Sequence, residues 1–296
     1  MQPFALLKSM RIPFLFLTPI CIALGSSISY KLAPHFNTDY LPLVLLCALF
    51  AHISVNLFNE YFDFKSGLDL ITQKTPFSGG SGALVNAPQM VKSTLFVAVL
   101  TITVTGIVGL YLVYSLGLAI LPLGLLGVAL VLFYTQWINK HPWICLVSPG
   151  LAFGIIMVAG SQFATSDSFH SSVWLIALVP FFLTNNLLLI NQYPDLSPDS
   201  QSGRNHFPIA FGIPMSNFVY ALFFSLTVIV ITYLVINKTI PALALIALTL
   251  FPLAFKVLSG AIKYGEQLSQ HPKYLAWNVV LCLSCPTLLT LGILLG

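Results

Sequence analysis

Two stretches of this chain repeat one spacing of amide and carboxylate side chains, and each stands at the end of an apolar run. The first is Asn59–Asp63 followed by Asp69, and the second is Asn191–Asp195 followed by Asp199. Five of the eight Asp and Glu residues of the chain lie in these two clusters. A carboxylate close to hydrocarbon is costly unless its charge is compensated, so this concentration indicates bound cations or a charged substrate.

The spacing suits oxygen ligands for Mg²⁺. On a helix, Asn59 and Asp63 share one face, and Asn56 and His52 continue the same polar line towards the membrane interior. Mg²⁺ takes one or two carboxylates per ion and completes its shell with water and phosphate oxygens. Two such clusters facing each other could hold a diphosphate between metal ions. His52, taken alone, is more readily explained as a hydrogen-bonded residue between helices than as a ligand.

The composition places most of the chain in lipid. Hydrophobic residues make up 57% of the 296 residues and charged residues 7%, whereas about a quarter of the residues of a soluble domain are charged. A helix needs about 20 mostly apolar residues to cross a bilayer, and the sequence offers nine such runs. Their approximate ranges are 12–32, 41–63, 91–115, 117–138, 143–165, 172–193, 214–236, 240–262 and 274–296. These runs are too long for barrel strands, so we expect an all-α integral membrane bundle of about nine transmembrane helices.

The basic residues predict how this bundle sits in the membrane. With nine spans, the N-terminus and every second connection lie on one side, and Lys and Arg favour the cytoplasmic side. Ten of the twelve basic residues fall on that side, and Lys31 and Lys238 fall on the other. We therefore expect a multi-pass protein of the cell inner membrane or another cytoplasmic-type membrane, with both acidic clusters on the cytoplasmic side. The formal net charge of +4 reflects this orientation, and we expect no nucleic-acid partner.

The connections on the cytoplasmic side are the longer and more polar ones. The second, from about Phe64 to Gln89, contains Thr75–Gly82, whose Ser and Gly residues could present backbone N–H groups to an anion. The sixth contains Asp195 and Asp199. The basic residues on this side that could share the charge of a diphosphate are Lys74, Lys140 and Arg204.

In layout and motifs the chain resembles the UbiA superfamily of membrane prenyltransferases, as a single domain over residues 1–296. The motifs that carry the resemblance are Asn59-Glu60-x-x-Asp63, Gly67-x-Asp69, Asp195-x-x-x-Asp199 and Gly203-Arg204. Position 60 is Glu where the family usually has Asp. Within the superfamily, the arrangement from Asp63 to Asp69 looks most like the menaquinone-pathway branch, whose members prenylate 1,4-dihydroxy-2-naphthoate.

The resemblance implies a chemistry and a set of site residues. Members of the superfamily are all-helical, bind a polyprenyl diphosphate through Mg²⁺ and transfer the prenyl chain to an acceptor, which is usually aromatic. Carried over to this chain, Asp63 and Asp195 would be catalytic. The metal ligands would be Asn59, Asp63, Asp69, Asp195 and Asp199. The residues that would bind or position the diphosphate are Arg11, Lys74, Thr75, Tyr134, Lys140 and Arg204.

The expected reaction begins with ionisation of the allylic C–O bond, because metal ions and basic side chains neutralise the diphosphate leaving group. The resulting carbocation needs a water-poor pocket, and aromatic faces can stabilise it. The polyprenyl tail would lie along apolar helix faces or in the membrane lipid. The aromatic residues that flank the two clusters are Phe58, Tyr61, Phe62 and Tyr193.

Two other interpretations remain open from the residues. A prenyltransferase with a non-aromatic lipid acceptor, such as a glycerol-phosphate lipid, would keep the metal site and change only the acceptor pocket. A secondary membrane transporter for a cation would explain why spans two and six end alike, since transporters often contain repeats. Transporter sites usually lie near the bilayer midplane, however, whereas these acids lie at one interface.

Overall fold

The molecule is a bundle of helices in the computed structural model, which describes residues 2–296, and none of these residues forms a strand. Eight segments are long and apolar enough to cross a membrane. They are Ile12–Leu32, Leu41–Ser66, Pro88–Leu116, Pro142–Ala164, Val173–Gln201, Phe207–Ile236, Ala242–Gln270 and Pro272–Leu295. A ninth apolar helical segment, Leu118–Phe133, is shorter. The predicted all-α membrane bundle of about nine helices is therefore confirmed.

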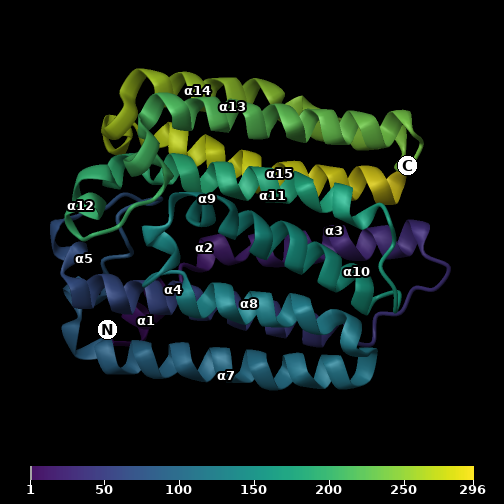
Figure 1. Ribbon diagram of the computed structural model, residues 1–296, viewed down its shortest axis with the longest axis horizontal. Helices are drawn as coiled ribbons and strands as arrows, with labels where there is room; N and C mark the ends of the chain where they lie inside the picture. The colour runs from purple at the N-terminus through teal and green to yellow at the C-terminus, as the bar shows by residue number, and fades with distance from the viewer. Residues whose placement is uncertain (1) are drawn as a thin grey trace.

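The elements follow one another with short connections (Figure 1). The α-helices are α1 (Gln2–Ser9), α2 (Ile12–Leu15), α3 (Leu17–Leu32), α4 (Leu41–Ser66), α5 (Leu68–Ile71), α6 (Ala83–Asn86), α7 (Val91–Leu116), α8 (Leu121–Phe133), α9 (Pro142–Gly150), α10 (Gly160–Ala164), α11 (Val173–Asn191), α12 (Leu196–Gln201), α13 (Phe207–Ile236), α14 (Phe251–Tyr264) and α15 (Pro272–Leu295). The 3₁₀ segments are η1 (Pro88–Met90), η2 (Leu118–Ile120), η3 (Ile138–Lys140), η5 (Tyr193–Asp195), η6 (Ala242–Leu250) and η7 (Gly265–Gln270), and η4 (Leu151–Ala159) is a π-helix.

The long helices lie side by side in two groups with others between them. In Figure 1, α4, α7 and α8 form one side of the bundle, α13 and α14 form the opposite side, and α3, α9 and α10 lie between. Helix α4 packs on α7 and α8, and α11 packs on α13 and α15. The largest apolar core joins α3, α11 and α15 around Leu24, Leu183 and Leu289. The bundle thus holds its middle helices in fixed positions between two outer groups.

Helix α8 is shorter than the predicted span 117–138. It ends at Phe133, and a turn precedes η3. Its 13 residues rise about 20 Å, less than the roughly 30 Å of a hydrocarbon core. The early end places Tyr134 on the wall of an internal cavity.

Two other helices depart from regular geometry at proline. In α9, Pro149 cannot donate a backbone hydrogen bond, and the chain continues as the π-helix η4. The N–H of Gly150 there donates to Asn185 Oδ1 at 2.6 Å. In α13, Gly212 has φ 78° and ψ 167° just before Pro214, so the regular part of this helix begins near the predicted start of the span at 214.

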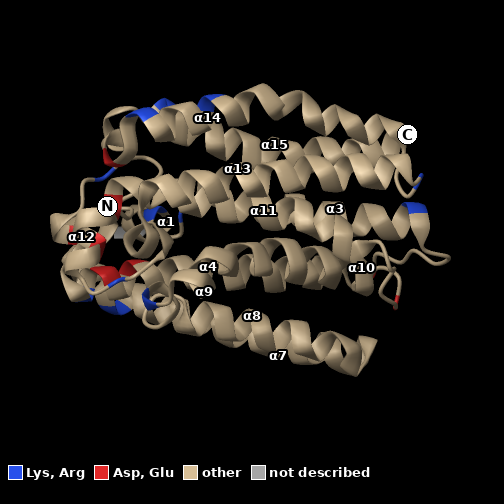
Figure 2. Cartoon of the chain, turned by 45° about the horizontal axis from the view of Figure 1, so that its top comes forward, with Lys and Arg blue, Asp and Glu red and all other residues tan. Residues whose placement is uncertain are grey.

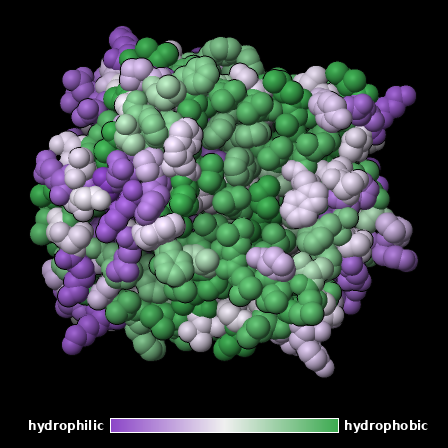
Figure 3. All heavy atoms as spheres, in the orientation of Figure 1, coloured by the Kyte–Doolittle hydropathy of each residue, from purple (hydrophilic) through white to green (hydrophobic). Residues whose placement is uncertain are grey.

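The charged residues are not spread evenly along the bundle. Figure 2 shows Asp, Glu, Lys and Arg gathered at the end that contains α12. Figure 3 shows a wide apolar band between hydrophilic ends. A helical bundle with this distribution is a multi-pass membrane protein.

Candidate active site at the mouth of an apolar cavity

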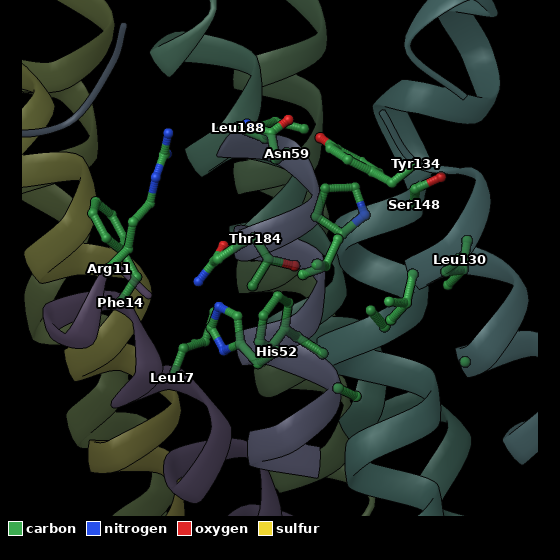
Figure 4. A pocket seen from close by; sticks show the side chains of 18 of the residues that line it. Arg11, Phe14, Leu17, His52, Asn59, Leu130, Tyr134, Ser148, Thr184 and Leu188 are labelled. Carbon is green, nitrogen blue, oxygen red and sulfur yellow. The ribbon is translucent and has the colours of Figure 1, made fainter. Parts of the chain in front are cut away.

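A large cavity runs from the charged end into the bundle. Its volume is about 410 Å³, and Figure 4 shows side chains from α2, α3, α4, α8, α9 and α11 around it. The predicted site residues that line it are Arg11, Asn59, Asp63, Asp69, Tyr134, Asp195, Asp199 and Arg204. Further in, much of the wall is apolar and includes Val44, Leu112, Val128 and Ile156. The cavity therefore joins a polar mouth to an apolar interior.

Arg204 connects the two acidic clusters. Its guanidinium donates to Oδ1 of Asp63 and, at 3.0 Å, to Oδ1 of Asp199. The other carboxylate oxygen of Asp199 lies 3.0 Å from Nε2 of His206. Gly203 has a φ of 80°, a conformation that favours glycine, and the turn it allows brings Arg204 back over Asp199. The end of α4 and the short helix α12 thus meet around one basic side chain.

The connection between α5 and α6 also joins the clusters. The N–H of Gly79 donates to Oδ2 of Asp195 at 2.9 Å. The Nζ of Lys74 donates to the backbone oxygens of Asp69 and Gly79 at 3.0 and 3.2 Å. Oγ1 of Thr75 accepts the N–H groups two and three residues further on, at 3.1 and 2.8 Å. Lys74 and Thr75 therefore hold the shape of this loop and do not line the cavity.

Glu60 anchors the same loop. Its carboxylate accepts the hydroxyl of Ser81 at 2.6 Å and the N–H groups of Ser81 and Ala83 at 3.2 Å each. The side chain is buried and does not line the cavity. The acid at this position of the motif is thus turned towards the loop, away from its neighbours Asn59 and Asp63.

Three buried oxygens near the mouth have no hydrogen-bond partner within residues 2–296. They are Oδ2 of Asp69, Oδ1 of Asn191 and Oδ1 of Asp195. An unpaired buried polar atom costs about 1–3 kcal/mol, so these oxygens suit a cation. In the part of the chain that the structure describes, no three His, Cys, Asp or Glu side chains form a compact metal group. Mg²⁺ keeps water and substrate oxygens in its shell and needs few protein oxygens.

The electrostatics of the mouth also favour a cation. Burial, and after it the Glu60 carboxylate, raise the pKa of Asp69 to about 6. Lys74, whose Nζ lies 3.5 Å from Oδ1 of Asp69, acts in the opposite direction. A cation beside Asp69 would stabilise the charged carboxylate.

The other predicted residues fall in different places. Arg11 precedes α2 with a left-handed backbone (φ 54°, ψ 51°) and lines the cavity. Oδ1 of Asn59 accepts the hydroxyl of Thr135 at 3.4 Å. Lys140 is exposed on η3 and is not part of the cavity wall.

The aromatic residues of the cavity differ from those that flank the motifs. Phe58, Tyr61, Phe62 and Tyr193 do not line it. Tyr193 is fully buried and donates to Oδ1 of Asn217 at 2.9 Å. The aromatic residues of the wall are Phe14, Phe77, Tyr134 and Phe153.

Comparison with known proteins agrees with this geometry. The profile of the UbiA prenyltransferase family matches residues 17–280. The chain belongs to this family. It is therefore a membrane prenyltransferase. This confirms the resemblance seen in the motifs and argues against the interpretation as a transporter.

Two relatives of this prenyltransferase carry the same name, 1,4-dihydroxy-2-naphthoate octaprenyltransferase. The one from Bacillus subtilis (strain 168) is 30% identical over 172 residues, which is 57% of this chain and 54% of the relative. The match thus spans about half of that relative. The one from Haemophilus influenzae is 24% identical over 278 residues, which is 92% of this chain and 90% of the relative.

Solved structures share the fold. A digeranylgeranylglyceryl phosphate synthase superposes with a TM-score of 0.70 at 14% identity, covering 100% of this chain and 99% of the other. A UbiA homologue from Archaeoglobus fulgidus bound to GPP and Mg²⁺ superposes with a TM-score of 0.68 at 12% identity, covering 99% and 100%. At these identities the likeness shows the common architecture alone.

Several polar residues of the prenyltransferase cavity were not predicted as site residues. They include Asn139, Ser148, Asn191, Gln192 and His206. Asn191 stands in the second motif, and its resemblance to Asn59 could have identified it. Ser148 has no such signal, because its hydroxyl donates to the carbonyl of Ile144 at 2.6 Å as helix serines commonly do.

Proposed function

We propose that this prenyltransferase transfers a polyprenyl group from a polyprenyl diphosphate to an aromatic acceptor of the 1,4-dihydroxy-2-naphthoate type, with Mg²⁺ as cofactor. The observation that carries the proposal is the meeting of two acidic clusters, with three unpaired buried oxygens, at the mouth of an apolar cavity. The names of the Bacillus and Haemophilus relatives, and of a third from Escherichia coli that is 27% identical, support the acceptor.

The donor set fits Mg²⁺, because it consists of carboxylate and amide oxygens. The residues that would hold the ions are Asn59, Asp63, Asp69, Asn191, Asp195 and Asp199. The bound metal would neutralise the diphosphate as it leaves and so assist ionisation of the allylic carbon.

Arg204 and Arg11 supply positive charge at the same mouth. Two N–H groups of Arg204 are bonded to Asp63 and Asp199, and a guanidinium has five such donors. The remaining donors can bind phosphate oxygens while the carboxylates hold the side chain in place. Arg11 reaches the cavity from the opposite end of the sequence.

The apolar wall excludes water from the carbon that ionises. A water-poor pocket protects a carbocation from hydrolysis, and the faces of Phe14, Tyr134 and Phe153 on this wall can stabilise its charge. The interior beyond them accepts the polyprenyl tail. Since the mouth lies at the end richer in Lys and Arg (Figure 2), we place it on the cytoplasmic side of the membrane.

Prenyl transfer by the purified protein in detergent tests this proposal. The assay contains a polyprenyl diphosphate, Mg²⁺ and one acceptor at a time: 1,4-dihydroxy-2-naphthoate, 4-hydroxybenzoate or a glycerol-phosphate lipid. The variants are Asp63→Asn and Asp195→Asn. Asp39→Asn is the matched control, because Asp39 is an exposed carboxylate in the connection between α3 and α4, at the other end of the bundle.

We expect transfer to the naphthoate that requires Mg²⁺ and falls about 100-fold or more in both site variants, with the control unchanged. Transfer to the glycerol-phosphate lipid alone would keep the metal site and overturn the acceptor. Transfer to the naphthoate that persists without divalent metal would overturn the role given to the acidic clusters.

A further inference from the structure

The polar line on α4 extends further into the cavity than a diphosphate site requires. Asp63 and Asn59 lie at the mouth, and Asn56 and His52 lie deeper on the same wall. Asn56 donates to the backbone oxygen of Met10 at 3.0 Å, so part of its polarity is used in packing. His52 lies two turns, about 10 Å, beyond Asn59. It is 7% exposed in a largely apolar part of the wall.

The imidazole of His52 is held in one orientation (Figure 4). Its Nδ1 lies 2.9 Å from Oγ1 of Thr18, and Phe153 meets the ring edge to face with centroids 4.8 Å apart. Thr18 is fully buried, and its hydroxyl makes no other hydrogen bond within residues 2–296. The hydroxyl of Thr18 therefore donates best to Nδ1 as an acceptor, and the N–H of the neutral ring is then at Nε2.

Nε2 of His52 has no acceptor among the described residues, and His52 forms part of the cavity wall. A polyprenyl tail offers no polar atom to this N–H, and covering it with hydrocarbon would cost free energy. An aromatic acceptor with hydroxyl and carboxylate groups has the opposite need, because its oxygens lose water on entering the cavity. A donor at this depth thus suits the acceptor and does not suit the tail.

We propose that Nε2 of His52 donates a hydrogen bond to an oxygen substituent of the aromatic acceptor, with Thr18 positioning the ring. This inference rests on the proposed function and names a residue that selects the acceptor. The separation of about 10 Å between the levels of His52 and Asn59 fits a fused two-ring acceptor better than a single ring. His52 therefore favours naphthoate-type acceptors over hydroxybenzoate-type ones.

Steady-state kinetics of His52→Leu, His52→Gln and Thr18→Val test the proposal, with KM measured separately for acceptor and for prenyl diphosphate. We expect His52→Leu to raise the acceptor KM about tenfold, the worth of one hydrogen bond, with the KM for prenyl diphosphate unchanged. His52→Gln retains a hydrogen-bond donor, so its acceptor KM should stay close to that of the wild-type protein. Thr18→Val should raise the acceptor KM by a smaller factor. A merely structural role would change both KM values together.

Competitive inhibition identifies the acceptor oxygen. The probes are 1-hydroxy-2-naphthoate, which lacks one ring hydroxyl, and 1,4-dihydroxynaphthalene, which lacks the carboxylate. One of them should bind the wild-type protein about tenfold more weakly than the complete acceptor, and that difference should vanish in His52→Leu.

An unchanged acceptor KM in His52→Leu, or equal increases for both substrates, would overturn the proposal. If His52→Leu fails to fold, an acceptor KM in Thr18→Val equal to that of the wild type overturns it, and a selective increase supports it. Wild-type protein that prenylates no aromatic acceptor would overturn the proposed function itself, an outcome distinct from failure of the His52 inference.

Discussion

The carboxylate oxygens at the cavity mouth differ in whether they accept a hydrogen bond from the protein. Arg204 pairs oxygens of Asp63 and Asp199, and the N–H of Gly79 pairs one oxygen of Asp195. Asp69 keeps one buried oxygen without a partner in residues 2–296, and so does Asp195. The unpaired oxygens have both lone pairs free for a metal ion, whereas each paired oxygen already uses one lone pair for its donor.

Metal binding should weaken as the pH falls through about 6. Burial and the nearby Glu60 carboxylate raise the pKa of Asp69 to about 6, so its carboxylate persists above that pH and is protonated below it. A protonated carboxyl does not bind a metal ion. For this group alone, Mg²⁺ affinity should be about tenfold lower at pH 5 than at pH 7.

The shift of Tm with added Mg²⁺, followed from pH 7 to pH 5, measures this effect. Asp69→Asn should bind Mg²⁺ more weakly at pH 7 and lose part of the pH dependence. If wild type and variant show the same dependence on pH, Asp69 is not a ligand.

The residues of the site differ in how far the sequence could predict them. The convergence of Asp63 and Asp195 at one end of the bundle was predictable, because their spacing from Asn59 and Asn191 places both at the ends of apolar runs that face the same side. The role of Glu60 was not, because it depends on a loop that folds back over the helix. The sequence also could not predict that Lys140 lies outside the cavity wall, because its position depends on the early end of α8.

Among the elements, the loop between α5 and α6 is anchored in part by the carboxylate of Glu60, which belongs to α4. Glu60→Ala would leave the N–H of Ser81 without an acceptor. The N–H of Ala83 would lose one of its two acceptors and keep Oγ of Ser81, at 3.0 Å. We expect hydrogen exchange at these two amides to increase roughly 10–100-fold and prenyl transfer to fall, with exchange in α13 and α15 unchanged. Glu266→Ala is the control, because Glu266 is exposed on η7 at the same end of the bundle. Equal exchange in both variants would show that Glu60 does not hold the loop.

The same loop approaches Asp69, a proposed metal ligand, so closely that only glycine fits at position 80 without a shift of its neighbours. A Cβ there would lie 2.2 Å from Oδ1 of Asp69, and the φ of Gly80 is 75°. Gly80→Ala should therefore displace Asp69 and raise the Mg²⁺ concentration needed for half-maximal transfer about tenfold or more. Gly106→Ala is the matched control, since a Cβ at Gly106 meets nothing within 4 Å. A Gly80→Ala protein with wild-type Mg²⁺ dependence would mean that Asp69 lies outside the metal shell.

At the scale of the whole molecule, the order of the spans was predictable from length and composition. Long apolar runs have to become helices in lipid, because each backbone N–H and C=O needs a partner within its own segment. The local departures were not predictable. The break at Gly212 and the π-helix after Pro149 depend on contacts between helices, such as the bond from Gly150 to Asn185.

The orientation of the bundle decides from which compartment the diphosphate enters. The end of α4 and the segment η5–α12, which carry the two acidic clusters, lie at one end of the bundle, and η7 packs against η5 there. The connection between α13 and η6 lies at the other end (Figure 1). Gln270 and Asn237 are exposed in these two regions. A cysteine introduced at either position therefore shows, by its labelling, on which side of the membrane that end of the bundle lies. The native cysteines interfere little, because Cys21, Cys145, Cys282 and Cys285 are buried and Cys47 is half-buried.

A membrane-impermeant maleimide added to intact bacterial cells should label Asn237→Cys at once and Gln270→Cys only after the membrane is opened. The physical reason is the excess of Lys and Arg at the α12 end, which favours retention of that end in the cytoplasm. The reverse labelling pattern would place the acidic clusters outside the cytoplasm. A prenyl diphosphate made in the cytoplasm would then have to cross the bilayer, charge included, before it could reach Arg204 and the carboxylates.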